Sequence, residues 1–76
     1  MRVSLVKAKK NYKGRIAEIS ALPATQNKFM SLGLYKGREI TKLSHFALRG
    51  PVTIKAGRSV IALGHSMAAK IILELE

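Results

Sequence analysis

The sequence contains no cysteine, and this absence excludes several kinds of chemistry at once. Without thiols the chain has no disulfide framework, no thiolate metal site and no cysteine nucleophile. Secreted domains of this size usually carry disulfides, so we expect a cytoplasmic protein. Long apolar runs are also missing. The longest, such as residues 60–63 and 71–73, are too short to cross a membrane, and the charged first residues lack the apolar run of a signal peptide.

Acidic residues are scarce, since four glutamates and no aspartate stand against fourteen lysines and arginines, for a net charge of +10. Six of these cations precede the first acid, Glu18, and they are Arg2, Lys7, Lys9, Lys10, Lys13 and Arg15. Such a positive field attracts an anionic partner, which can be nucleic acid, an acidic protein face or an anionic membrane surface. Alternatively, the lysines serve only to keep a small domain soluble, and composition leaves both readings open.

Groups that could carry catalysis are also few. Ser66 follows His65, but the chain has no aspartate to orient the histidine. Glu74 and Glu76 share one strand face near the end of the chain, where solvated charge is common. No phosphate-binding loop of the G-x-x-x-x-G-K-[ST] type is present. We therefore expect a binding protein, not an enzyme, and expect it to have no cofactor.

The two histidines, His45 and His65, are the only candidate metal ligands besides the scattered glutamates. A stable site needs three or four ligands with supporting hydrogen bonds, and two histidines fall short of that number. We interpret both as ordinary strand or surface residues and expect no metal site.

Aromatic residues are limited to two tyrosines and two phenylalanines. Proteins that bind single-stranded nucleic acid usually stack bases on exposed rings. Phe29 and Phe46 fall at expected core positions, which leaves Tyr12, within Lys9–Lys13, as the only ring in a basic stretch. This pattern is a weak indication of nucleic-acid binding and favours a solvated loop.

One helix is predicted from Ala24 to Leu32, after a proline at position 23 that requires an extended residue before it. Gly33 follows where a left-handed residue would end the helix, and Leu34 can then fold back onto its last turn. The apolar residues expected at this end of the helix are Phe29, Met30 and Leu32.

The strands are expected to be short. After a leading strand or turn and a basic loop, they are predicted at residues 15–20, 39–46, 52–56, 59–63 and 71–76. Imperfect alternation in the first of these indicates a bulge or bend. Gly37, Pro51 and Gly57 are expected in turns, the last within a tight hairpin, and Ser66 is expected to cap a single helical turn that ends at Lys70. Residues 59–63 are apolar on both faces, which favours a central strand.

About five short antiparallel strands and one short helix, in a chain of this length, close best into a small barrel without exposed edges. The expected fold is therefore mostly β, with a single domain spanning residues 1–76.

Three stretches together resemble the FeoA family. Residues 27–37 resemble its helix end, in which Leu-Gly-Leu is followed by a turn glycine. Residues 50–54 are similar to its turn into the third strand, and residues 59–63 with Ile71–Leu73 are similar to its closing segments. Lys36 departs from the family pattern, since members often carry proline there.

The resemblance implies a small SH3-like barrel that acts in ferrous iron uptake. FeoA proteins are cytosolic accessories of FeoB, a membrane permease with a GTP-binding domain, so the implied partner is a FeoB-like permease. The same fold occurs as the C-terminal domain of iron-dependent repressors. Their preceding DNA-binding and metal-binding regions have no room before Gly14, which favours a free-standing accessory protein. The alternative is a small basic β-barrel that binds RNA or DNA.

Two groups of residues are candidates for partner binding. The turn Leu34-Tyr35-Lys36 follows a fixed helix end, and an aromatic side chain beside a lysine is typical of an interface contact. The basic residues Lys9, Lys10, Lys13 and Arg15 could steer association with an acidic or membrane-adjacent surface. If the turn only packs over the end of the barrel, the helix face around Gln26 and Asn27 is the next candidate.

Overall fold

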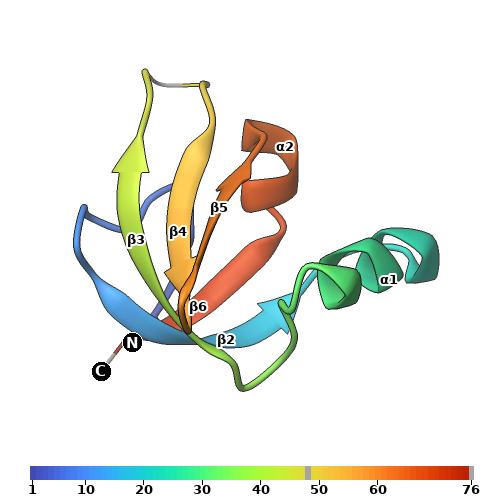
Figure 1. Ribbon diagram of the computed structural model, residues 1–76. Coiled ribbons are helices and arrows are strands. Elements are labelled where there is room, and N and C mark those ends of the chain that lie inside the picture. Colours follow the sequence, from blue (N-terminus) through green and yellow to red (C-terminus); the bar gives the residue numbers. More distant parts are fainter. Residues whose placement is uncertain (48, 76) are drawn as a thin grey trace.

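The computed structural model describes residues 1–47 and 49–75. Six strands and two helices lie within these residues (Figure 1). The strands are β1 (Arg2–Ser4), β2 (Lys13–Ile19), β3 (Glu39–His45), β4 (Val52–Ala56), β5 (Ser59–Leu63) and β6 (Ile71–Leu75). The helices are α1 (Pro23–Ser31) and α2 (His65–Ala68).

The strands form one antiparallel sheet in the order β1-β6-β2-β3-β4-β5. This confirms a mostly β, antiparallel fold with short helical segments, although there are six strands where five were expected. The expected closure into a barrel is wrong for the described residues, because β1 and β5 lie at the two ends of the order and do not pair. β1 is only three residues long and a turn begins directly after it, which leaves too little strand to close the sheet.

The core draws on nearly every element of the sheet and on both helices. Phe29 of α1 is its largest fully buried side chain. The strands contribute Ile16, Ile40, Val52, Ile54, Ala56, Leu63, Ile71 and Leu73, and the connecting segments and α2 add Leu5, Ala8, Leu34 and Ala68.

Helix α1 ends as the sequence predicts. Gly33 has a φ of 81°, its amide donates to the Met30 carbonyl at 2.9 Å, and the Leu34 amide donates to the Phe29 carbonyl at 2.9 Å. This pair of bonds is a Schellman motif, and Leu34 and Phe29 supply its usual apolar contact positions, both buried. Of the apolar residues expected at this end of the helix, Met30 and Leu32 are exposed, because α1 projects from the sheet and reaches the core mainly through Phe29 (Figure 1).

Two strands carry bulges. The register of β2 against β6 shifts between Ile16 and Glu18, which confirms the expected irregularity. The register of β3 against β4 shifts between Lys42 and Ser44, so one extra residue interrupts the alternation after Lys42. Phe46, expected in the core, is 76% exposed as a result.

Two local predictions in the second half of the chain are wrong. Residues 59–63 form an edge strand rather than a central one, because α2 carries the chain away before β6 returns to pair with β1 and β2. Ser66 does not cap α2. The helix starts at His65 after Gly64, whose carbonyl accepts the Ala68 amide at 2.9 Å.

Candidate functional site: a groove beside the turn after helix α1

The turn between α1 and β3 is fixed at both ends by backbone bonds. Leu34 is anchored through the Schellman motif, and the Arg38 amide donates to the Tyr35 carbonyl at 3.0 Å. The Gly37 amide donates to the Ile16 carbonyl of β2 at 2.8 Å, and its φ of 94° suits glycine. The turn is therefore a rigid frame that presents the side chains between its anchors.

The three candidate residues of this turn have different environments. Leu34 is 1% exposed and belongs to the core, so its role is to anchor the turn. Tyr35 is 43% exposed and Lys36 is also exposed, so both side chains are available to a partner.

Arg38 holds the Tyr35 ring in place. Its guanidinium lies 5.7 Å from the ring centroid, and Nη1 donates to the tyrosine hydroxyl at 3.4 Å. A Cβ at Gly57 would lie 2.8 Å from Nη2 of the same arginine. The Arg38 guanidinium thus lies beside both the Tyr35 turn and the hairpin turn between β4 and β5, two turns that the sequence predicts separately.

A groove of about 300 Å³ lies between α1, β2 and this turn. It is lined by Ala17, Glu18, Ile19, Gln26, Met30, Leu34, Tyr35 and Lys36. Gln26 is positioned there by its side-chain amide, which donates to the Ala21 carbonyl at 2.8 Å. The groove therefore joins the two candidate surfaces, the Tyr35 turn and the helix face around Gln26, into one.

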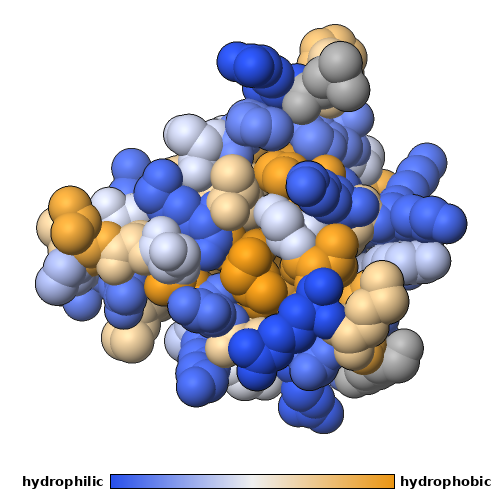
Figure 2. All heavy atoms as spheres, turned by 180° about the vertical axis from the view of Figure 1, so that it is seen from behind, coloured by the Kyte–Doolittle hydropathy of each residue, from blue (hydrophilic) through white to orange (hydrophobic). Residues whose placement is uncertain are grey.

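Helix α1 and the residues that flank it leave apolar side chains in solvent, of which Met30 lines the groove. Leu22 is 79% exposed and Met30 is 63% exposed, and Leu32 adds a partly exposed side chain at the end of the helix. In Figure 2, the α1 lobe lies on the left after the half-turn and carries apolar atoms at its tip. Apolar surface beside a few charged groups can bind an apolar side chain of another protein.

The predicted basic residues divide into two groups. Lys9 and Lys10 are exposed in the segment before β2. Lys13 lies 3.7 Å from a Glu39 oxygen, and Arg15 lies in cross-strand register between Glu39 and Glu74. Part of the positive charge is therefore offset on the sheet itself, and the segment before β2 keeps the rest.

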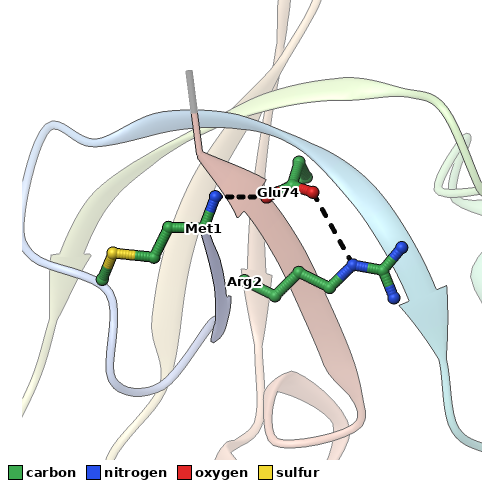
Figure 3. Close-up of polar contacts among 3 residues, drawn as sticks. All are labelled: Met1, Arg2 and Glu74. Atoms are coloured by element: carbon green, nitrogen blue, oxygen red, sulfur yellow. Dashed lines mark hydrogen bonds and ion pairs between the residues drawn. The ribbon is translucent and has the colours of Figure 1, made fainter.

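Glu74 forms a second charged contact with the first residues of the chain (Figure 3). One of its oxygens lies 2.6 Å from the Met1 ammonium and the other lies 3.7 Å from Arg2 Nε. The hydrogen bond from the ammonium is the main reason that the pKa of Glu74 lies below its usual value. This contact ties β1 to β6. Glu76, the other glutamate of this segment, lies outside the described residues.

Lys42 is a buried charged residue that sequence reasoning did not single out. It lies on the buried face of β3, in phase with Ile40. It is 3% exposed, and its ammonium donates to the Ala8 carbonyl at 2.7 Å and the Val6 carbonyl at 3.1 Å. Its backbone carbonyl accepts the Asn11 amide at 2.7 Å, and its backbone amide donates to the Tyr12 carbonyl at 2.9 Å. Burial lowers the pKa of Lys42. This lysine fixes the path of the basic segment.

Tyr12 is 41% exposed and lies beside Lys13, next to a shallow hollow that Met1, Asn11 and Leu75 also line. Asn11 precedes it with a φ of 69°, which turns the chain sharply before β2. One exposed ring among lysines is the feature that a nucleic-acid-binding role would use.

The two histidines lie together, although they are far apart in sequence. Their ring centroids are 5.8 Å apart with planes inclined by 27°. His45 Nε2 and His65 Nδ1 are buried and make no hydrogen bond within the described residues. No group of three or more metal-binding side chains lies among those residues. The pairing of His45 with Val52 and of Val52 with Leu63 is what brings the rings together, and this register is not visible in the sequence.

Comparison with solved structures defines the class of protein. A crystal structure of an iron uptake regulatory protein, FeoA, matches with a TM-score of 0.88 and 26% identity, covering 100% of this chain and 99% of that one. A manganese-dependent transcriptional repressor matches with a TM-score of 0.90 and 21% identity, but this chain spans only 42% of it. The FeoA protein from Chlorobium tepidum matches with a TM-score of 0.84 and 20% identity, covering 96% of this chain and 70% of that one. The fold is thus the SH3-like domain of these proteins.

The chain belongs to the FeoA family, because the FeoA domain model matches residues 3–75. A search of curated protein sequences finds no match. Neither helix of the described residues has the length and apolar character needed to cross a membrane.

Proposed function

We propose that this protein is a small, non-catalytic accessory of ferrous iron uptake in the cytoplasm, and that it binds the cytosolic part of a FeoB-like, GTP-binding permease. The observation that carries the proposal is the FeoA domain match over residues 3–75, supported by the likeness to an FeoA protein over the whole chain. Activation, inhibition and scaffolding of the permease all require such contact.

The contact surface is the groove with Tyr35 and Lys36. Tyr35 offers a large ring whose orientation is already fixed by Arg38, so little conformational entropy is lost when it binds. The groove accepts an apolar side chain of the permease against Ile19 and Met30. Lys36 supplies a positive charge at the same place, and Lys9 and Lys10 add long-range attraction to an acidic face or to the anionic inner surface of the membrane.

The test is the double substitution Tyr35→Ala with Lys36→Ala. Both side chains are exposed, so the melting temperature should stay close to that of the wild type. Binding to the purified cytosolic part of the permease should weaken about tenfold or more, since aromatic anchors of interfaces contribute about 2 kcal/mol or more. Ferrous iron uptake in cells that depend on this protein should fall in parallel.

The matched control is Tyr12→Ala with Lys10→Ala, which removes the same side-chain types from a different turn. It should weaken permease binding and iron uptake much less than the Tyr35 variant does, because it removes only one of the charges that attract the permease from a distance and no side chain of the groove. If the Tyr35 variant keeps both activities with an intact fold, its turn is not the interface.

Binding of RNA or DNA is the second candidate function, and exposed Tyr12 beside Lys13 is the feature that favours it. Titration with single-stranded oligonucleotides at low and at physiological salt distinguishes the two functions. Tight, steeply salt-dependent binding that is lost in the Tyr12→Ala, Lys10→Ala variant would replace the permease proposal.

A further inference from the structure

Strand β5 leaves one backbone edge of the sheet without a partner strand. It pairs only with β4, in an unbroken register from Ala56 opposite Ser59 to Val52 opposite Leu63. Because a two-residue turn joins the strands, Ala56 and Ser59 form a hydrogen-bonded pair, and every second pair after them does the same. The amides and carbonyls of Val60 and Ala62 therefore point away from β4. No other backbone hydrogen bond of the described residues reaches β5.

This edge lacks the features that usually protect an exposed strand, namely a charged side chain, a proline, a bulge or very short length. β5 has five residues, none of them charged or proline, and its register against β4 has no bulge. Val60 is 63% exposed. The opposite edge is different, because β1 has only three residues and carries Arg2, which is paired with Glu74.

The charged side chains of β4 and of the turn into β5 are positive, although Glu39 lines a hollow together with Lys55 and Gly57. Lys55 lies directly across from Val60, and Arg58 occupies the turn that leads into the strand. Arg38 approaches the same turn at Gly57. The sequence has no acidic residue from position 40 to position 73. A strand that adds here meets an electropositive surface, which favours glutamate and aspartate side chains in that strand.

A second copy of this chain does not suit the edge. Each copy has a net charge of +10 and the same cations beside β5, so pairing of two copies would bring like charges together.

We propose that β5 binds an extended, acidic segment of a partner protein as an additional strand of the sheet. The backbone of Val60 and Ala62 supplies the hydrogen bonds, and Lys55 and Arg58 select acidic side chains. This surface is separate from the groove at Tyr35 and does not depend on the iron-uptake role. Arg38 lies beside both turns, so one partner could occupy the two surfaces together.

The probe is a short peptide that alternates glutamate with valine, compared with one that alternates lysine with valine. Added to the purified protein, the glutamate peptide should slow hydrogen exchange at the Val60 and Ala62 amides and shift their NMR signals. The lysine peptide should bind about tenfold more weakly or not at all. Equal binding of both peptides would overturn the acidic specificity, and unchanged exchange at both amides would overturn the site.

Ala62→Pro removes one outward-pointing donor without removing a bond to β4, and prolines are tolerated at such edge positions. This variant should bind the glutamate peptide about tenfold more weakly, while Ala62→Val, which keeps the donor, should bind as the wild type does. Normal binding by Ala62→Pro would contradict strand addition.

Arg58→Glu tests whether positive charge selects the acidic partner, and it leaves the backbone donors of β5 unchanged. It replaces Ala62→Pro as the test if the proline variant does not fold. It should weaken binding of the glutamate peptide and strengthen binding of the lysine peptide. If neither affinity changes, Arg58 does not select the partner. If the protein alone forms dimers whose Val60 and Ala62 amides are protected, the occupant is a second copy and the proposal is wrong.

Discussion

At the scale of single residues, Gly33 shows how one backbone angle sets the position of the site. Its φ is 81°, and a Cβ built there would meet no atom within 4 Å. The penalty for a side chain is therefore conformational and not a clash. Gly33→Ala should lower the free energy of unfolding by about 1 kcal/mol, and the β-branched Gly33→Val should lower it further, as measured by urea unfolding.

Gly64→Ala is the matched control. Gly64 also has open space around its Cβ position, but its φ is −58°, which any residue adopts. This variant should be as stable as the wild type or slightly more stable, because alanine reduces the entropy of the unfolded chain. Equal melting temperatures for Gly33→Val and the wild type would mean that the left-handed helix end is misassigned.

Because of Lys42, the free energy of unfolding is expected to depend on pH in the alkaline range. Burial lowers its pKa in the folded protein below the unfolded value of about 10.4, so the unfolded chain holds this proton more tightly. Burial of the charged lysine therefore costs stability below the folded pKa. This cost disappears as the pH rises to the unfolded pKa, so the stability is fully present above that value and is lost as the pH falls through the folded pKa. Relative to Lys42→Met, the wild type should gain free energy of unfolding as the pH rises from neutral toward that value.

Urea unfolding at several pH values measures this difference. Lys55→Met, which removes an exposed lysine of the neighbouring strand, controls for the loss of one charge from the sheet. An identical pH dependence in the two variants would rule out a special role for Lys42. Loss of the Lys42 ammonium also leaves the Val6 and Ala8 carbonyls without their donor, which should loosen the basic segment in hydrogen exchange.

At the scale of elements, the sequence predicts what depends on local conformation. The helix end at Gly33, the hairpin turn at Gly57 and the alternation of β4 all follow from residue preferences over a few positions, and the structure contains each of them. Position in the sheet depends instead on pairing between distant segments. The sequence predicts β5 as a central strand because it is apolar on both faces, yet it lies at one edge of the sheet.

The two phenylalanines test this distinction between local pattern and packing. Phe29 is 0% exposed and Phe46 is 76% exposed, although both fit an apolar periodicity. Phe29→Ala should destabilise the domain by about 3–5 kcal/mol, which could unfold a chain of this size. Phe46→Ala should change stability by about 0.5 kcal/mol or less.

Chemical unfolding of both variants, with circular dichroism to show that each still folds, makes the comparison. Similar losses of stability in the two variants would mean that Phe46 packs against the core, which contradicts its exposed position directly after β3.

At the scale of the whole molecule, the site is formed by contacts that no local pattern contains. The sequence predicts Tyr35 and Lys36 as a presented turn, and their exposure is consistent with that prediction. The groove, however, requires β2 and α1 to meet, and the Tyr35 ring requires Arg38 to reach it across the turn. Lys42 with the basic segment, and His45 with His65, also come together only through the sheet register.

The net charge of +10 belongs to this scale as well, because the field of the whole domain acts before any contact forms. Reversal of two exposed charges, Lys9→Glu with Lys10→Glu, should slow association with the purified cytosolic part of the permease several-fold at low salt. The dissociation rate should change much less, since charges at the rim of an interface act mainly on association. The difference should shrink toward physiological ionic strength, where the Debye length is about 8 Å.

Arg49→Glu with Lys70→Glu is the control, because it makes the same change in net charge at other exposed or partly exposed positions. Equal slowing by the two double variants would show that overall charge, not the segment before β2, guides the encounter. Association rates that do not depend on salt in any of these proteins would contradict steering altogether. The lysines would then serve solubility, and the groove beside Tyr35 would have to supply both the rate and the affinity of binding.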